Sequence, residues 1–225
     1  MTTEINTFSA AVDDVVARSG RPDRVADIIA FVRVTIRELQ ALRFFRNDLI
    51  EDTLTADAAN YVWDYPQEFR LLRTVKYPYF DGQGKPMYPP EILPGKLQKD
   101  FDYYYYGGPG YYVFAGTALA DLIDVAYYKF AKKIPYYAVA NRPATFVLDD
   151  DAWSYLASGT DAENLIAREK VSNWVLFNYY DTVVEGGMAK ILKTVGDPRS
   201  MSSFALYKSY QQTMTATEPS DSLNK

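Results

Sequence analysis

Apolar residues recur with the period of an α-helix near the start of the chain. A first stripe occupies positions i, i+3, i+4, i+7 and i+8, on Phe8, Ala11, Val12, Val15 and Val16. A second stripe follows on Val25, Ile28, Ile29, Val32, Ile36 and Leu39. Asn6 or Thr7 stands where a cap is expected, Gly20 where the first helix should end, and Pro22 where the next should begin. The pattern predicts an antiparallel helical hairpin with a tight turn at 19–21.

The helical period stops after Arg43. Residues 61–66 and 69–77 are rich in β-branched and aromatic side chains, which is typical of strands. Prolines and glycines then interrupt the chain up to Gly110. Within this stretch, the pattern over residues 96–105 leaves a short helix and an extended loop equally open.

Two further strands are predicted after the glycine-rich stretch. Residues 111–115 and 120–130 are again apolar and aromatic, and Gly116-Thr117 lies between them. Short apolar runs on either side of such a pair indicate a β-hairpin. The sequence therefore predicts that these two strands pair with each other.

Helical character returns at Asp161, a candidate cap. Residues 162–185 contain neither proline nor glycine, and their apolar side chains fall on more than one stripe. A helix that is apolar on several sides is buried on several sides, and in a short chain a neighbouring subunit is expected to cover one of them. Gly186-Gly187 either kinks this helix or lets another backbone approach closely. Residues 188–195 extend the helix, and a last helix is predicted over 202–213.

These elements predict an α+β fold that is mainly α. A helical bundle is expected from the N- and C-terminal helices, with a β-rich, loop-rich insertion at its centre. The expected divisions are a helical hairpin over 1–43, the insertion over 44–160, C-terminal helices over 161–214 and a flexible polar tail over 215–225.

Composition narrows the range of functions. The 225 residues include no cysteine and no histidine, which excludes disulfides, thiolate zinc sites, histidine-ligated metals and serine–histidine triads. The net charge of −5 and the absence of a long Lys/Arg cluster argue against tight DNA binding by the free chain. The N-terminus lacks a signal-peptide pattern and no apolar run reaches membrane-spanning length, so we expect synthesis in a cytoplasm and no membrane contact.

The chain is unusually rich in tyrosine, with 20 Tyr beside 12 Phe and 3 Trp. Tyrosine is enriched where a partner buries a surface, although a tyrosine-rich sheet edge is equally open for any one residue. We therefore expect partner contacts rather than catalysis, and no cofactor. The candidate interface residues are Tyr103, Tyr104, Tyr105, Tyr106, Trp174, Phe177, Tyr179, Phe204, Tyr207 and Tyr210.

Acidic residues give only weak signals of chemistry. The run Asp149-Asp150-Asp151 lacks the alternating spacing and the glycine of a Ca²⁺ loop, so a solvated turn is the simpler interpretation. A carboxylate pair for sugar hydrolysis would have to come from residues far apart in the chain, such as Asp121, Asp124, Asp181 and Glu185. The sequence predicts no metal site and no enzyme.

Several stretches resemble a known family. They are 8–18 with 22–43, Tyr61-Val62-Trp63-Asp64-Tyr65-Pro66, 69–75, 110–116, 123–130, and Asn173-Trp174 through 181–186 to 193–199. In order and texture these resemble the head-to-tail adaptor (head completion or connector) proteins of tailed phages, especially short-tailed ones. The proline- and tyrosine-rich stretch 78–109 departs from that pattern.

The resemblance implies a structural virion protein of the neck. It implies a ring, expected to be twelvefold, below the portal protein and above tail or nozzle proteins, with double-stranded DNA passing through the lumen unread. A C-terminal segment, here 201–225, would reach the portal. The alternatives are another neck or tail protein, such as a tail terminator or baseplate part, and a carbohydrate-binding or carboxylate-dependent hydrolase domain.

Overall fold

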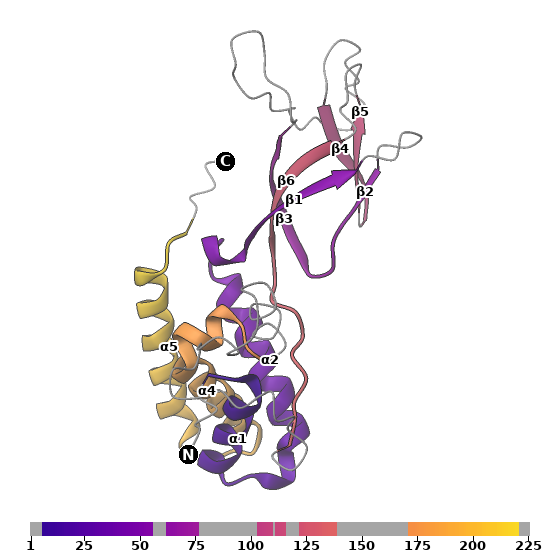
Figure 1. Cartoon of the computed structure of the whole chain (residues 1–225). Helices are drawn as coiled ribbons and strands as arrows, with labels where there is room; N and C mark the ends of the chain where they lie inside the picture. The colour runs from indigo at the N-terminus through magenta and orange to yellow at the C-terminus, as the bar shows by residue number, and fades with distance from the viewer. Residues whose placement is uncertain are drawn as a thin grey trace, which may run out of the picture. The chain divides into compact units, whose positions relative to one another are not determined.

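The computed structural model describes residues 6–55, 62–76, 103–109, 111–115, 122–138 and 171–220. The chain divides into two compact units. A helical unit comprises residues 1–47 and 131–225, and a sheet unit comprises residues 48–130. Figure 1 shows the helices and strands of each unit along the chain. Among the described residues more lie in helices than in strands, so the predicted α+β class with a larger helical part is confirmed.

The N-terminal helices form as predicted. Helix α1 (Phe8–Ser19) begins at Thr7, whose hydroxyl accepts a 3.1 Å hydrogen bond from the Ala10 amide. It ends at Gly20, which adopts a left-handed conformation with φ 70° that favours glycine. Pro22 opens a short 3₁₀ turn, η1 (Pro22–Arg24), and α2 (Val25–Ala41) follows. The predicted stripes place Phe8, Ala11, Val12, Val15, Ile28, Val32, Ile36 and Leu39 in the core.

Helix α4 (Trp174–Thr194) begins later than the sequence indicated. Ser172 and Asn173 are not helical, and Asn173 caps α4 by accepting a 3.0 Å hydrogen bond from the Leu176 amide. The prediction of one continuous helix over 162–185 was therefore wrong at 172–173, and 162–170 lies outside the described residues. The helix departs from regular geometry at Tyr179 (φ −134°, ψ 41°) rather than at the two glycines.

Helix α4 packs against α1, α2 and α5 (Ser200–Thr217) of its own chain, as Figure 1 lets the reader follow. Gly186 and Gly187 allow this close packing. A Cβ on Gly186 would press against the Thr35 side chain and lie 2.8 Å from the Tyr207 ring, and one on Gly187 would lie 3.1 Å from Val15 and Val32. The sequence left a kink or the close approach of another backbone open at these glycines; the helix does not kink there, and the atoms nearest an added Cβ belong to side chains. The idea that a second subunit covers α4 was wrong for its buried residues, because α1, α2 and α5 cover them.

The described residues of the sheet unit form two three-stranded antiparallel sheets. In one, β6 (Leu122–Lys129) lies between β1 (Leu49–Thr55) and β3 (Phe69–Lys76). In the other, β5 (Tyr111–Ala115) lies between β2 (Val62–Asp64) and β4 (Tyr103–Gly108). The predicted hairpin of 111–115 with 120–130 was wrong, because these strands belong to different sheets.

Strand β6 is the centre of its sheet. Tyr127 and Tyr128 are adjacent, so their side chains point to opposite faces, and they are 4% and 0% exposed. Both faces of the sheet are therefore covered at this point. The Tyr128 hydroxyl accepts a 3.1 Å hydrogen bond from Arg73 on β3.

The Arg70 side chain on β3 contacts both ends of the sheet unit. Asp48 closes the 3₁₀ turn η2 (Arg46–Asp48), and its carboxylate accepts a 3.1 Å bond from Arg70. The guanidinium also lies over the Phe130 ring, 4.6 Å from its centroid. Burial lowers the pKa of Arg70 while Asp48 opposes that effect. The first and last residues of the unit are thus tied to one side chain.

Residues 131–138 return the chain to the helical unit as an extended segment. The Ala131 amide donates to Gln40, the Tyr136 hydroxyl to Asp13 and the Tyr137 amide to Ser9, at 3.1, 2.8 and 3.0 Å. The sheet unit accordingly ends at Phe130, well before the residue 160 expected from the sequence; residues 139–160 lie outside those described.

The C-terminal segment is held rather than free up to Ser220. The predicted last helix is longer than expected, because α5 continues to Thr217, and the tail predicted from Thr215 was therefore wrong at its start. The Arg46 amide donates to the Pro219 carbonyl at 3.1 Å, and Phe45 forms a β-bridge with Ser220. Residues 221–225 lie outside the described part.

Candidate protein-binding groove

Six large apolar side chains are exposed in the part of the chain that the structure describes. They are Val34, Leu42, Phe177, Met201, Phe204 and Leu206. Met201 and Phe204 are the most exposed, at 82% and 53%. Scattered single residues of this kind are normal, but a cluster of them marks a surface for binding. Three of the six do cluster, because Leu42, Met201 and Phe204 line the same groove.

The groove lies where the end of α2 and the end of α4 meet the start of α5. Its volume is about 730 Å³. It is lined by Glu38, Ala41, Leu42, Ala189, Lys190, Lys193, Ser200, Met201, Phe204, Tyr207, Lys208 and Gln211. All of these residues belong to the helical unit, so the groove is complete within one compact part of the molecule.

Polar bonds fix the floor of the groove. Tyr207 is only 3% exposed, and its hydroxyl donates to Glu38 at 3.3 Å. Lys190 donates to the same carboxylate at 2.6 Å and to Thr35 at 3.1 Å, while its ammonium lies 5.1 Å from the Tyr207 ring centroid. Burial, reinforced by the charge of Glu38, raises the pKa of Tyr207, which keeps its hydroxyl a donor. These contacts join α2, α4 and α5 and preorganise the groove.

The rim of the groove is positively charged. Its lining includes three lysines and one glutamate, a balance of +2, whereas the whole chain carries −5. Lys193 and Lys208 are exposed, and the Lys208 ammonium lies 5.5 Å from the Phe204 ring centroid. A groove lined by apolar side chains and bordered by lysines suits a partner surface that offers apolar side chains beside carboxylates.

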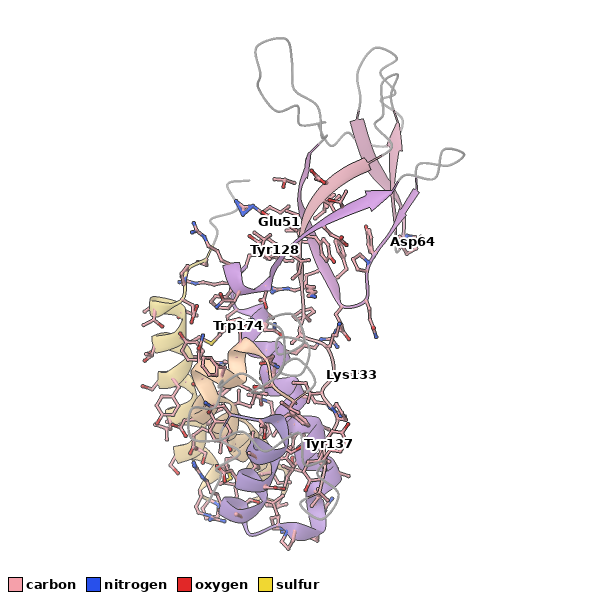
Figure 2. All side chains as sticks on the ribbon, in the orientation of Figure 1. Glu51, Asp64, Tyr128, Lys133, Tyr137 and Trp174 are labelled. Atoms are coloured by element: carbon pink, nitrogen blue, oxygen red, sulfur yellow. The ribbon has the colours of Figure 1, made fainter. Side chains whose placement is uncertain are left out.

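Four of the predicted interface residues of α4 and α5 fall into two pairs, one in the groove and one at the start of α4. Phe204 and Tyr207 come together in the groove. Trp174 and Tyr179 lie near the start of α4, and Figure 2 labels Trp174 there. Trp174 packs edge-on against Phe45 at 5.4 Å and Tyr179 at 6.4 Å, so this aromatic cluster serves the packing of its own chain.

Phe177 and Tyr210 are not among the residues that line the groove. Phe177 is 41% exposed near the start of α4. Tyr210 is half-buried on α5 and does not line the groove.

The four consecutive tyrosines, Tyr103–Tyr106, form strand β4. Their register on β5 runs from Tyr103 opposite Ala115 to Tyr106 opposite Tyr112, with an irregularity before Gly108. The sequence had left Tyr103 to Tyr105 open between helix and loop, and the structure makes them strand. They lie at the edge of the order β2-β5-β4 in the described sheet.

The candidate carboxylates do not gather into one described site. Asp124 borders a hollow of about 540 Å³ in the sheet unit with Glu51 and Asp52, and it accepts a 2.6 Å bond from Thr53. Asp181 and Glu185 are on α4, where Glu185 pairs with Arg18 at 3.4 Å. Asp121 and Asp149–Asp151 lie outside the described residues. Within the described ranges no group of three or more acidic residues is placed to hold a metal ion.

Sequence reasoning missed most of the groove. Met201, Phe204 and Lys208 follow at i, i+3 and i+7 on one face of α5, so helical spacing was a usable signal. Leu42 and Lys193 carried no such signal, since they reach the groove only through the packing of three helices.

No protein-family model matches the chain, and no curated protein sequence matches it significantly. Among the helices that the structure describes, none has the length and apolar character to cross a membrane.

Proposed function

We propose that this chain is a structural virion protein, a head-to-tail adaptor that forms a ring beneath the portal of a tailed phage and connects it to the tail. The observation that carries the proposal is the groove of α2, α4 and α5, in which Met201 and Phe204 are 82% and 53% exposed. The sequence resemblance to adaptor proteins supports the same assignment.

The chemistry of the groove favours a protein partner over a substrate. Its lining is apolar with lysines at the rim, and its single carboxylate, Glu38, is engaged by Tyr207 and Lys190. A glycosidase would need two convergent carboxylates in one cleft. Exposed apolar side chains ringed by charge are instead the anatomy of a protein–protein interface.

The proposed arrangement uses the two units differently. The helical unit is the bundle that builds the ring and meets the portal, and residues 48–130 are the β-rich insertion that faces tail or nozzle proteins. In this arrangement double-stranded DNA passes through the lumen, repelled by an acidic chain rather than bound by it. The location is the neck of the virion, and the function is assembly rather than catalysis.

Electron microscopy of labelled particles tests the proposal. A small tag after Lys225, detected with a gold-conjugated antibody, should mark the junction of head and tail. A matched tag on a tail-tip protein controls for label accessibility. Label at the tail tip or along the tail tube would favour another tail protein, and absence of the chain from purified particles would contradict a structural role.

A further inference from the structure

The groove is a valley between two helices that both pack on a third. Helices α2 and α5 each pack on α4. Ala189 of α4 is buried, so α4 supplies part of the floor. Leu42, at the end of α2, and Met201 and Phe204 of α5 are exposed along the sides. The lining on α5 runs from 200 to 211, which is about 17 Å along a helix, or about three turns.

The shape of the lining selects a helical occupant. None of the described residues that line the groove belongs to a strand, so an extended segment would find no ladder of backbone hydrogen-bond partners there. A segment buried in the groove must satisfy its own backbone groups, as a helix does. A pocket for a small ligand encloses most of that ligand, whereas the sides of this groove are exposed side chains.

The charge of the lining selects an acidic occupant. Lys190 is paired at 2.6 Å with Glu38, the single carboxylate of the lining. Lys193 is exposed on α4, and Lys208 donates to the neutral amide of Gln211 at 2.9 Å. Within the part of the chain that the structure describes, neither Lys193 nor Lys208 has a carboxylate partner. Two ammonium groups beside exposed apolar side chains are complemented by carboxylates that flank an apolar helix face.

We propose that the groove binds an acidic, amphipathic α-helix of a neighbouring virion protein. Apolar side chains of that helix, spaced i, i+3 or i+4 and i+7, would contact Leu42, Met201 and Phe204. Its carboxylates would face Lys193 and Lys208. The inference rests on the proposed function, which it deepens by naming the kind of segment that the partner presents.

Fluorescence anisotropy with a synthetic probe tests the occupant. The probe is a labelled peptide of about 14 residues, enough for about four helical turns, with leucines on one face and glutamates on the others. The full chain should bind it, and a peptide of the same composition without the apolar face should bind at least about tenfold more weakly. Phe204→Ala should weaken binding of the probe by about tenfold or more, as expected for an aromatic anchor.

Leu206→Ala is the matched control for the loss of an exposed apolar side chain. Leu206 is 40% exposed on the same helix but does not line the groove, so this variant should bind the probe like wild type. Unchanged unfolding midpoints would show that both variants fold. Probe binding that Phe204→Ala leaves unchanged would overturn the inference, as would the absence of probe binding by the wild-type chain.

Charge reversal tests the acidic face of the occupant. Lys193→Glu should weaken binding of the glutamate probe, and Lys193→Glu with Lys208→Glu should make the chain prefer a probe in which lysines replace the glutamates. Lys133→Glu, at an exposed lysine outside the groove, controls for net charge and should change neither affinity. A wild-type chain that binds the two probes equally, or a double variant that still prefers glutamates, would contradict the assignment.

Sedimentation velocity of the full chain without peptide distinguishes a second copy from a helix of another protein. Self-association that is lost in Phe204→Ala would assign the groove to a second copy and overturn the inference. The proposed function would still stand if the labelled chain marks the head–tail junction. Conversely, probe binding by a chain that is absent from purified particles would contradict the proposed function and leave the preference of the groove for an acidic helix intact.

Discussion

Helices α4 and α5 lie side by side but use their apolar residues in opposite ways. Eleven of the 21 residues of α4 are buried, and they face α1, α2 and α5. In α5 only three of 18 residues are buried, Tyr207, Gln211 and Met214, which form one narrow stripe. Helix α5 nevertheless exposes Met201, Phe204 and Leu206.

The difference corrects a common argument from sequence. An apolar pattern on several sides of a helix predicts several contacts, but it does not say which chain supplies them. For α4 the chain itself supplies them. The helix with uncovered apolar side chains is α5. Its buried residues form a narrow stripe, and its apolar residues are not concentrated on one face. Apolar surface that is available to a partner can therefore be recognised only once it is known which apolar side chains the chain buries by its own packing.

The largest expected change in the free energy of unfolding comes from a buried leucine of α4. Leu176 on α4 is 0% exposed, so Leu176→Ala should lower the free energy of unfolding by about 2–5 kcal/mol through lost burial and a residual cavity. Leu206→Ala on α5 should change it by no more than about 0.5 kcal/mol, because the side chain is already exposed. Urea unfolding followed by the helical circular dichroism signal measures both. Equal losses would mean that the two helices are covered alike.

An intermediate effect is expected where α4 meets α2 and α5. In an open helix, Gly→Ala stabilises by about 1 kcal/mol. At Gly186 the added Cβ would press on Thr35 and lie 2.8 Å from the Tyr207 ring, so Gly186→Ala should instead destabilise, by about 1–3 kcal/mol.

Gly187→Ala is the graded control for that substitution. Its Cβ would meet only the methyl groups of Val15 and Val32 at 3.1 Å, so the destabilisation should be smaller. The same denaturant titration ranks the two variants. Stabilisation by Gly186→Ala would show that α4, α2 and α5 have room between them, and that the floor of the groove is not rigid.

The parts of the fold that the sequence predicted are those that depend on local contacts. Stripe, cap and stop signals placed α1 and α2, since Thr7 and Gly20 act within one turn of their helix. The α+β fold class with a larger helical part was predictable for the same reason. The break at Ser172-Asn173 was also readable in principle, because Asn173 is a good capping residue ahead of Trp174.

The parts that the sequence did not predict depend on distant contacts. Strand β1 has polar residues at its centre, Glu51 to Thr53, and its identity comes from pairing with β6, about 70 residues later. Residues 111–115 have the pattern of a hairpin partner for β6, but in the structure they pair with β2 and β4 instead. The sequence analysis named only Phe204 and Tyr207 of the groove, although helical spacing could have added Met201 and Lys208. Leu42 and Lys193 could not be found in this way, because they come from other helices.

The smallest expected effect concerns how the far end of α5 is attached. The Tyr179 hydroxyl contacts Thr217 at 2.9 Å and donates to Glu218 at 2.8 Å. Tyr179→Phe removes these bonds and keeps the ring against Trp174, so the cost should be about 0.5–1.5 kcal/mol. Glu218 keeps its bonds from Asn47 and Asn178, which limits the loss.

Hydrogen exchange locates that effect, because the amide of Glu218 donates to Met214 and should exchange faster in Tyr179→Phe. Tyr210→Phe, at a half-buried position in the middle of α5, is the control and should leave this amide protected. If α5 is attached to its own chain mainly by a narrow stripe and by this terminal contact, loosening the contact should leave the groove at the other end intact. Faster exchange at amides near Phe204, at the other end of the helix, in Tyr179→Phe would mean that the two ends of α5 are coupled, and that the helix is less independent of its neighbours than its three buried residues indicate.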